Sequence, residues 1–166
     1  MQRRQFVKNS LLSLIPLSLA SSPSAFARSK RKFRWRLVLA IPKTLPIWGE
    51  LLQAYSKKIE LMTEGGLQIK VYGAKELVPA LGTFDAVKSG VVEMGHSASY
   101  YWQGKIPESV FFCAVPFGLD ANGMQAWIQH GGGQQLWDKI YKAHGVMALP
   151  AGNTGMQMGG WFKKEI

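Results

Sequence analysis

Residues 35–72 have the sequence WRLVLAIPKTLPIWGELLQAYSKKIELMTEGGLQIKVY, and this stretch decides the fold. Residues 35–41 form an apolar run that ends at Pro42, which predicts a buried strand. Residues 67–72 alternate between apolar and polar side chains and predict a second strand. With a helix between them and tight connections, the two strands are expected to form a right-handed βαβ unit.

The segment between these strands has the periodicity of an amphipathic helix. From Thr44 onward, apolar side chains recur every three or four residues and form one stripe opposite charged residues. Thr44 is expected to cap this helix, and Gly65 and Gly66 are expected to end it. The predicted stripe consists of Leu45, Trp48, Leu52, Tyr55, Ile59 and Met62.

The alternation of strand and helix continues along the chain. Residues 79–89 have helical spacing and end at Gly90, and residues 91–94 are expected to form a third strand. Such alternation predicts an α/β fold with a mostly parallel sheet. Further strands are expected at 110–119 and 146–149, helices at 122–130 and 133–144, and a turn-rich loop at 150–155.

A ligand site in such a sheet is expected beyond the carboxyl ends of the strands. Residues 96–103, HSASYYWQ, come just after the third predicted strand. They combine hydroxyl groups with aromatic rings, which favours a pocket wall at this place.

The first 27 residues have the organisation of an export signal. A basic start precedes an apolar stretch at 11–20, and small residues around Ala27 predict cleavage after it. The apolar stretch is too short to span a bilayer. Arg3 and Arg4, followed by Phe6 and Lys8, resemble a twin-arginine signal, which the export machinery recognises.

The positive charge of the chain is concentrated before Leu37. Nine of the 20 basic residues precede it without any acid, so eleven basic and ten acidic residues remain from Leu37 onward. The expected folded part is therefore almost neutral, which argues against a nucleic-acid partner. Residues 28–36 are expected to be a basic, mobile N-terminus of the exported chain.

Enzyme motifs are incomplete in this sequence. Residues 130–133, HGGG, resemble the oxyanion loop of α/β-hydrolases, and residues 95–99 nearly form a nucleophile elbow. The elbow requires glycine where Ser99 stands, and the glycine run follows the serine instead of preceding it. The three histidines are too widely spaced for a zinc site, and no phosphate-binding loop is present. We therefore expect no catalytic residue and no enzyme, with an α/β-hydrolase as the alternative.

Six motifs together resemble the extracytoplasmic solute receptors of TRAP transporters, in the dicarboxylate-receptor family, family 7. The similarity is greatest to the branch that binds 2-oxoacids, and it extends over the whole chain. The motifs are WRL at 35–37, ELVP at 76–79, YYW at 100–102, VPF at 115–117, HGGG at 130–133 and GNTGMQMGGWF at 152–162.

The resemblance implies a periplasmic-binding-protein-like lobe of type II, with helices on both faces of the sheet. Residues 37–150 would form the first lobe of a two-lobed clamp, and 151–166 would begin the crossing toward the second. Gln157 matches the glutamine that binds both the substrate and a cation, and Tyr100 and Asn153 fall at positions that face the pocket. An amide suits this role because its oxygen ligates a hard cation while its NH2 donates to a carboxylate.

The function implied is that of a periplasmic receptor. It would capture a small 2-oxo monocarboxylate such as pyruvate, together with sodium or another hard cation and without a covalent cofactor, for the TRAP membrane subunits. Members of the family are about twice as long, and the arginine that pairs with the substrate carboxylate lies beyond Ile166. We therefore expect a truncated receptor, with a remnant that binds no solute as the alternative.

Overall fold

The structure, a computed structural model, describes residues 31–113, 115–155 and 163–164 of the 166-residue chain. The chain divides into two compact units, Met1–Arg31 and Lys32–Ile166, and all the helices and strands described belong to the second. The expected leader and its cleavage site after Ala27 lie outside the described residues. None of the helices in the described ranges is long and apolar enough to cross a bilayer.

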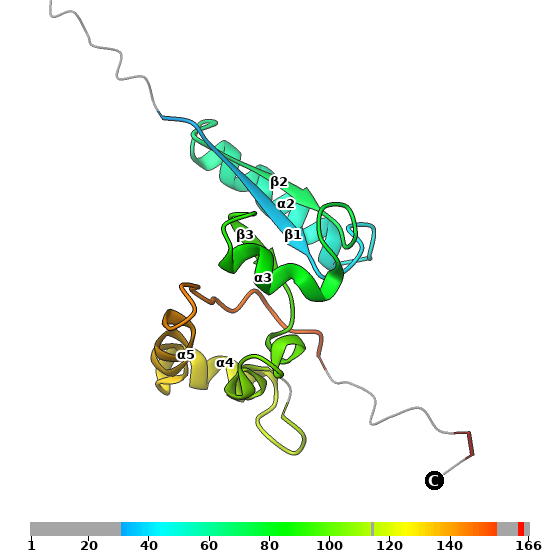
Figure 1. Cartoon of the computed structure of the whole chain (residues 1–166), viewed down its shortest axis with the longest axis vertical. Helices are drawn as coiled ribbons and strands as arrows, with labels where there is room; N and C mark the ends of the chain where they lie inside the picture. Colours follow the sequence, from blue (N-terminus) through cyan, green and yellow to red (C-terminus); the bar gives the residue numbers. More distant parts are fainter. Residues whose placement is uncertain (1–30, 114, 156–162, 165–166) are drawn as a thin grey trace, which may run out of the picture. The chain divides into compact units, whose positions relative to one another are not determined.

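Three parallel strands form the sheet. They are β1 (Phe33–Leu39), β2 (Leu67–Tyr72) and β3 (Met94–His96), in the order β2-β1-β3 (Figure 1). Leu37 of β1 lies opposite Val71 on one side and Met94 on the other. The predicted α/β fold with a parallel sheet is confirmed. The prediction of a mobile segment through residue 36 is wrong from Phe33 onward, because residues 33–36 pair with β2.

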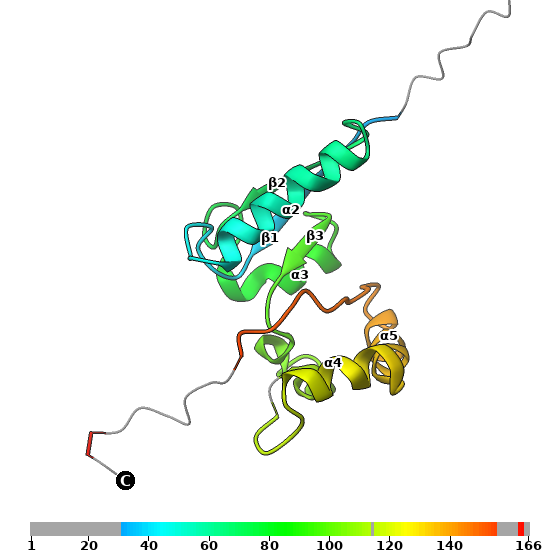
Figure 2. The same ribbon diagram turned by 180° about the vertical axis from the view of Figure 1, so that it is seen from behind.

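Helices cover both faces of the sheet, as expected for this type of lobe. Leu37 and Leu39 pack against Leu52 and Ile59 of α2 (Trp48–Met62). The residue between them points the opposite way, because successive side chains of a strand alternate. Val38 packs in a cluster with residues of α3 (Thr83–Lys88) and with Val92. Figures 1 and 2 accordingly show α2 and α3 on opposite sides of the sheet.

The start of α2 differs from the prediction. Thr44 does not cap it, because the residues after β1 first form a turn in which Leu45 N–H donates to the Pro42 carbonyl at 3.0 Å. Ile47 is the N-cap residue with a φ of 68° and no side-chain cap, so the helix begins at Trp48. Its predicted end is confirmed, since Gly65 has a φ of 75° and donates to Glu60 at 2.8 Å.

The apolar stripe of α2 is narrower than predicted. Tyr55 and Met62 are 53% and 75% exposed, although the periodicity assigned both to the buried face. The line that meets the sheet runs through Leu52, Ser56 and Ile59, and the Ser56 hydroxyl donates to the Ile69 carbonyl of β2. A buried serine thus occupies a place in this line, and periodicity of apolar residues alone does not reveal it.

The third strand lies three residues later than predicted. A short 3₁₀ turn, η1 (Ala80–Gly82), leads into α3, and residues 91–93 return from that helix to the sheet. Val92 is buried beneath α3, and its N–H donates to the Ala86 carbonyl at 3.2 Å. Strand pairing therefore starts only at Met94, after the polar contact made by Glu93.

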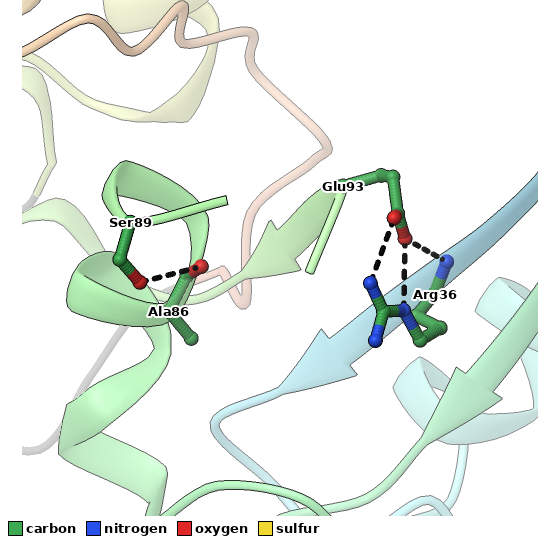
Figure 3. A network of polar contacts seen from close by, with 4 residues as sticks. All are labelled: Arg36, Ala86, Ser89 and Glu93. Atoms are coloured by element: carbon green, nitrogen blue, oxygen red, sulfur yellow. Dashed lines mark hydrogen bonds and ion pairs between the residues drawn. The ribbon is translucent and has the colours of Figure 1, made fainter. Parts of the chain in front are cut away.

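Glu93 links residues 91–93 to β1 through hydrogen bonds. Its carboxylate accepts hydrogen bonds from the Arg36 backbone N–H at 2.7 Å, from Nε at 3.1 Å and from Nη2 at 2.8 Å (Figure 3). In the same view the Ser89 hydroxyl donates to the Ala86 carbonyl at 3.3 Å, at the end of α3. The carboxylate thus pairs with the backbone N–H of Arg36, the residue just before the β1–β3 pairing begins at Leu37.

The remaining elements are helical. They are η2 (Ser99–Trp102), η3 (Pro107–Phe112), α4 (Ala121–His130) and α5 (Gly133–Lys142). The predicted helices at 122–130 and 133–144 are confirmed to within two residues at each end. The strand predicted at 110–119 is wrong, because its first residues complete η3. The strand predicted at 146–149 is also wrong, since these described residues pair with no neighbouring strand.

An aromatic core explains why residues 110–112 are helical. The ring of Phe112 stacks on Trp137 at 4.9 Å between centroids and on Trp127 at 5.8 Å. These contacts come from α4 and α5, so packing with distant helices overrides the local preference for a strand. The buried members of this core are Phe84, Ile106, Phe112, Ile128, Trp137 and Tyr141.

Adjacent phenylalanines test this packing. Phe112 is 5% exposed, whereas Phe111 is 57% exposed. Phe112→Ala should lower the free energy of unfolding by about 3 to 5 kcal/mol, because it leaves a cavity in the stack. Phe111→Ala should lower it by less than about 1 kcal/mol. Urea denaturation of both variants measures the difference, and equal losses would show that the stack is not the core.

Glu93 gives the fold a testable pH dependence. Hydrogen bonds from the Arg36 side chain and then its backbone lower the pKa of Glu93 from 4.5 to about 2. A carboxyl group with a lower pKa in the folded state stabilises the fold above its unfolded pKa, and this contribution is lost as the pH falls. Urea unfolding should therefore show stability decreasing from about pH 4.5 toward about pH 2.

Two variants identify the source of this dependence. Glu93→Gln should remove the part of the decrease that belongs to Glu93. Arg36→Gln should remove a smaller part, because the backbone N–H of residue 36 still donates to the carboxylate. An unchanged pH profile in Glu93→Gln would contradict the assignment.

Candidate functional site

The carboxyl ends of the three strands meet at one edge of the sheet. The Ala40 N–H, just after β1, donates to the His96 carbonyl at the end of β3, at 2.9 Å. On the other side, the Ala74 N–H after β2 donates to the Ile41 carbonyl at 2.9 Å. Parallel α/β sheets bind ligands beyond this edge. The segments that follow the strands therefore define the candidate site.

Three distant segments contact one another at this edge. The Trp48 ring, at the start of α2, lies 5.3 Å from the His96 ring between centroids, with 37° between their planes. Gly152 lies against the same indole, because a Cβ on it would come within 2.7 Å of Trp48 Cη2. The loop predicted at 150–155 is thus brought back to the edge formed by β1 and β3.

Polar atoms are buried without partners at the end of β3 and in the turn that follows it. His96 Nδ1, Ser97 Oγ and Ser99 Oγ have no hydrogen-bond partner within the described part of the chain. Ser99 is only 5% exposed. Buried polar atoms without partners are uncommon in folded proteins, and each calls for an explanation such as a ligand or an ordered water. Three of them within four residues agree with the prediction that segment 96–103 lines a site, although Ser109 Oγ in η3 is buried in the same way.

Tyr100 lies in η2, directly after this turn. Its ring packs edge-on against Tyr101 at 5.0 Å, and the side chain remains partly exposed. Burial, followed by the neighbouring Tyr101 and Cys113, raises the pKa of Tyr100 above its ordinary value. The phenol therefore keeps its proton at neutral pH and can donate a hydrogen bond to an anion.

Asn153 is exposed in the loop beyond Gly152. Its side-chain oxygen accepts a hydrogen bond from the Gly155 N–H at 2.8 Å, which fixes the amide in a local turn. The NH2 end of the amide is then the donor side of this residue. In the described part of the chain, Asn153 and Tyr100 share no hydrogen bond or ring contact.

Gln157, the residue predicted to bind both substrate and cation, lies outside the described residues. Among the described residues, no three His, Cys, Asp or Glu side chains lie close enough together to hold a metal ion. Tyr100 and Asn153 lie within the described residues and Gln157 lies outside them, and all three stay predictions as site residues.

The contact between Trp48 and Gly152 was not predicted from the sequence. The periodicity placed Trp48 in the apolar stripe of the helix, and Gly152 in a turn-rich loop. A signal was present in the loop, since glycine at 152 permits a φ of 128°, which other residues rarely adopt. Their contact joins residues far apart in the sequence, so no local pattern predicts it.

A separate apolar groove lies away from the sheet edge. It has a volume of about 550 Å³ and is lined by η3, α4, α5 and the 115–119 segment. Neither Tyr100 nor Asn153 lines it. With Glu108 as its one charged lining residue, it lacks the donors that a small acid requires.

The glycines after His130 have a structural role. Gly132 has a φ of 88° and precedes α5, and a Cβ on Gly133 would come within 2.9 Å of the Ile128 backbone and the Trp127 ring. These glycines let α4 and α5 meet closely. The motif that resembled a hydrolase oxyanion loop is thereby explained by helix packing.

His96 makes stability depend on pH near neutrality. Burial lowers the pKa of His96 from its ordinary value of 6.5. Below about pH 6.5 the unfolded chain takes up a proton that the folded chain resists, so the free energy of unfolding should fall with falling pH. His96→Asn should remove this fall, measured by urea denaturation between about pH 7.5 and pH 5.

The exposed His130 provides the matched control. His130→Asn should leave the fall in place, because the side chain lies in solvent at the end of α4. A flat profile in the unaltered chain would contradict a buried, neutral His96.

The family model described as "Bacterial extracellular solute-binding protein, family 7" matches residues 40–166. A curated relative, the monocarboxylate 2-oxoacid-binding periplasmic protein of Nostoc sp. strain PCC 7120, is 41% identical over the whole of this chain. That alignment covers 46% of the relative, so this chain spans about half its length.

Solved structures give the same result. A TRAP periplasmic solute-binding protein from Colwellia psychrerythraea, with bound calcium and pyruvate, is 47% identical with a TM-score of 0.79. One from Pseudoalteromonas atlantica, with bound sodium and pyruvate, is 46% identical with a TM-score of 0.78. Each comparison covers 82% of this chain, and 42% and 41% of the respective structures.

Proposed function

This chain belongs to the family-7 bacterial extracellular solute-binding proteins, and on that premise we propose that it forms part of a receptor for a small 2-oxo monocarboxylate such as pyruvate. The acid would be bound together with sodium or calcium and delivered to the membrane subunits of a TRAP transporter. TRAP solute-binding proteins are periplasmic, and the leader at 1–27 would direct this chain there through the twin-arginine export machinery. The protein would bind its solute without changing it.

One observation carries this proposal. Two relatives with 46% and 47% identity to this chain both hold pyruvate with a cation. Sequence similarity of this degree extends to the residues that surround a binding site more reliably than a shared fold alone does, since a fold supports many functions. The choice of a 2-oxo acid also agrees with the Nostoc relative, which is 41% identical.

The described residues are chemically suited to an anionic ligand. Tyr100 keeps its phenolic proton and can donate it in a hydrogen bond, and the amide of Asn153 has its NH2 as donor. Both follow segments that end at, or return to, the carboxyl edge of the sheet. Pyruvate offers acceptor oxygens only, on its carboxylate and its carbonyl, so a wall of neutral donors suits it.

Gln157 is proposed to connect the acid to the cation. Its amide oxygen would ligate the cation and its NH2 would donate to the carboxylate. Hard cations prefer six or more oxygen ligands, and the described residues contain no acidic cluster to supply them. The substrate oxygens and residues beyond the described ranges would complete the coordination.

The family implies binding between two lobes, of which residues 37–150 would be the first and 151–166 the start of the crossing. This chain spans about half the length of its relatives, so binding by the chain alone is itself part of the proposal. Its alternative is a remnant that folds but binds no solute.

Calorimetric titration of the chain without its leader separates these two possibilities. With sodium or calcium present, pyruvate should give saturable heat with a dissociation constant on the order of micromolar. Removing the cation should weaken binding at least about tenfold, because the carboxylate then loses its counter-charge. Absence of heat up to millimolar pyruvate, in a chain that is folded by circular dichroism, would establish the remnant.

Matched glutamines test the proposed ligand. Gln157→Ala should abolish measurable binding, since both the cation and the acid lose a partner. Gln129→Ala, on the exposed surface of α4, should leave the dissociation constant unchanged. Equal binding by both variants would remove Gln157 from the site.

A further inference from the structure

Trp48 lies at the carboxyl edge of the sheet, where it contacts two other segments of the chain. Its position in the sequence does not reveal these contacts. It is the first residue of α2. Its side chain is partly buried, whereas a side chain at an exposed helix end is ordinarily in contact with solvent. Its ring contacts His96, the last residue of β3, and Gly152 in the loop beyond residue 149. These contacts are made by the start of a helix whose remaining length packs on the sheet.

The backbone just before Trp48 has an unusual conformation that restricts the position of the ring. Ile47 has a φ of 68° and a ψ of −67°, a conformation that β-branched residues rarely adopt. A strained residue of this kind persists only where the surrounding structure requires it, and such residues concentrate at functional sites. Trp48 N–H also donates to the Pro46 carbonyl at 2.8 Å.

Gly49 fixes the helix start from the other side. A Cβ on Gly49 would come within 2.0 Å of the Lys43 carbonyl oxygen, so the helix begins in direct contact with the backbone of the turn after β1. The residues on both sides of Trp48 therefore restrict where its indole can lie. The ring is held in place by the backbone as well as by its own packing.

The His96 ring packs against the indole in a tilted arrangement. Its backbone carbonyl accepts from Ala40 at 2.9 Å, which ties the end of β3 to β1, and its ring lies 5.3 Å from that of Trp48. The imidazole Nδ1 is buried without a partner. An apolar ring would give the same packing without burying this nitrogen, so packing alone does not account for a histidine here.

The other end of the indole contacts the loop at 150–155. A Cβ on Gly152 would lie 2.7 Å from Cη2, 3.4 Å from Cζ3 and 3.7 Å from Cζ2 of Trp48. Gly152 therefore lies close to the Cη2 end of the six-membered ring, with no room there for a side chain. Asn153 is the next residue, and Gln157 follows four positions further along the chain.

We propose that Trp48 is a positioning residue of the binding site: packed against His96, its indole is the group that Gly152 lies against, and it thereby sets the position of the loop that bears Asn153. This inference rests on the proposed function, because it concerns the wall of the same site. Trp48 acts through the loop, and direct contact between the indole and the ligand is not required.

Hydrogen exchange tests the positioning without any ligand. In Trp48→Ala, the backbone amide of Gly155, which donates to Asn153 Oδ1 at 2.8 Å, should exchange at least about tenfold faster than in the unaltered chain, because the loop loses its support. In Trp48→Phe, which keeps a ring on His96, the increase should be smaller. Trp35→Ala, a replacement on β1 away from this edge, should leave the exchange of the Gly155 amide unchanged. Equal exchange in Trp48→Ala and the unaltered chain, with the sheet amides still protected, would overturn the proposal.

Calorimetry with pyruvate and calcium then connects the loop to binding. If the unaltered chain binds, Trp48→Ala should raise the dissociation constant at least about tenfold, and Trp48→Phe should recover most of the affinity. Unchanged affinity in Trp48→Ala would overturn the inference and leave the proposed function intact. If the unaltered chain does not bind, the proposed function fails, and the exchange experiment still decides whether Trp48 positions the loop.

Discussion

Burial of β1 on both faces is the constraint on which the rest of the structure depends. Leu37 and Leu39 face α2, and Val38 between them faces α3 and Val92. A central strand with apolar side chains on both faces requires a helix on each side and a parallel neighbour at each edge. Once this is satisfied, the carboxyl ends of all three strands meet at one edge, and the segments that leave them form the candidate site.

Local patterns predicted the part of the fold that this constraint governs. The alternation in residues 67–72 gave β2 with its observed bounds, and the apolar run at 35–41 gave most of β1. Both are properties of consecutive residues, which the sequence displays directly. The strand predicted at 110–119 failed because Phe112 stacks with two tryptophans of later helices. Such a preference is set by tertiary packing and has no local signature.

Some features of the candidate site could likewise be predicted from the sequence, and others could not. Tyr100 and Asn153 were predicted as site residues through the family resemblance, and they remain predictions. Trp48 was assigned to the buried stripe of a helix, because a helical period cannot distinguish a ring that covers the sheet from one that supports a loop. Only the fold brings Trp48, His96 and Gly152 together, and their contacts connect the stable sheet to the loop that leads to Gln157.

The most direct measurement is a crystal structure of the chain without its leader, grown with pyruvate and calcium, in which anomalous scattering locates the cation. We expect both ligands at the carboxyl edge of the sheet, with the Gln157 amide between them and Tyr100 nearby. Ligand density in the apolar groove of α4 and α5, or a Gln157 side chain directed into bulk solvent, would contradict a binding site at the sheet edge.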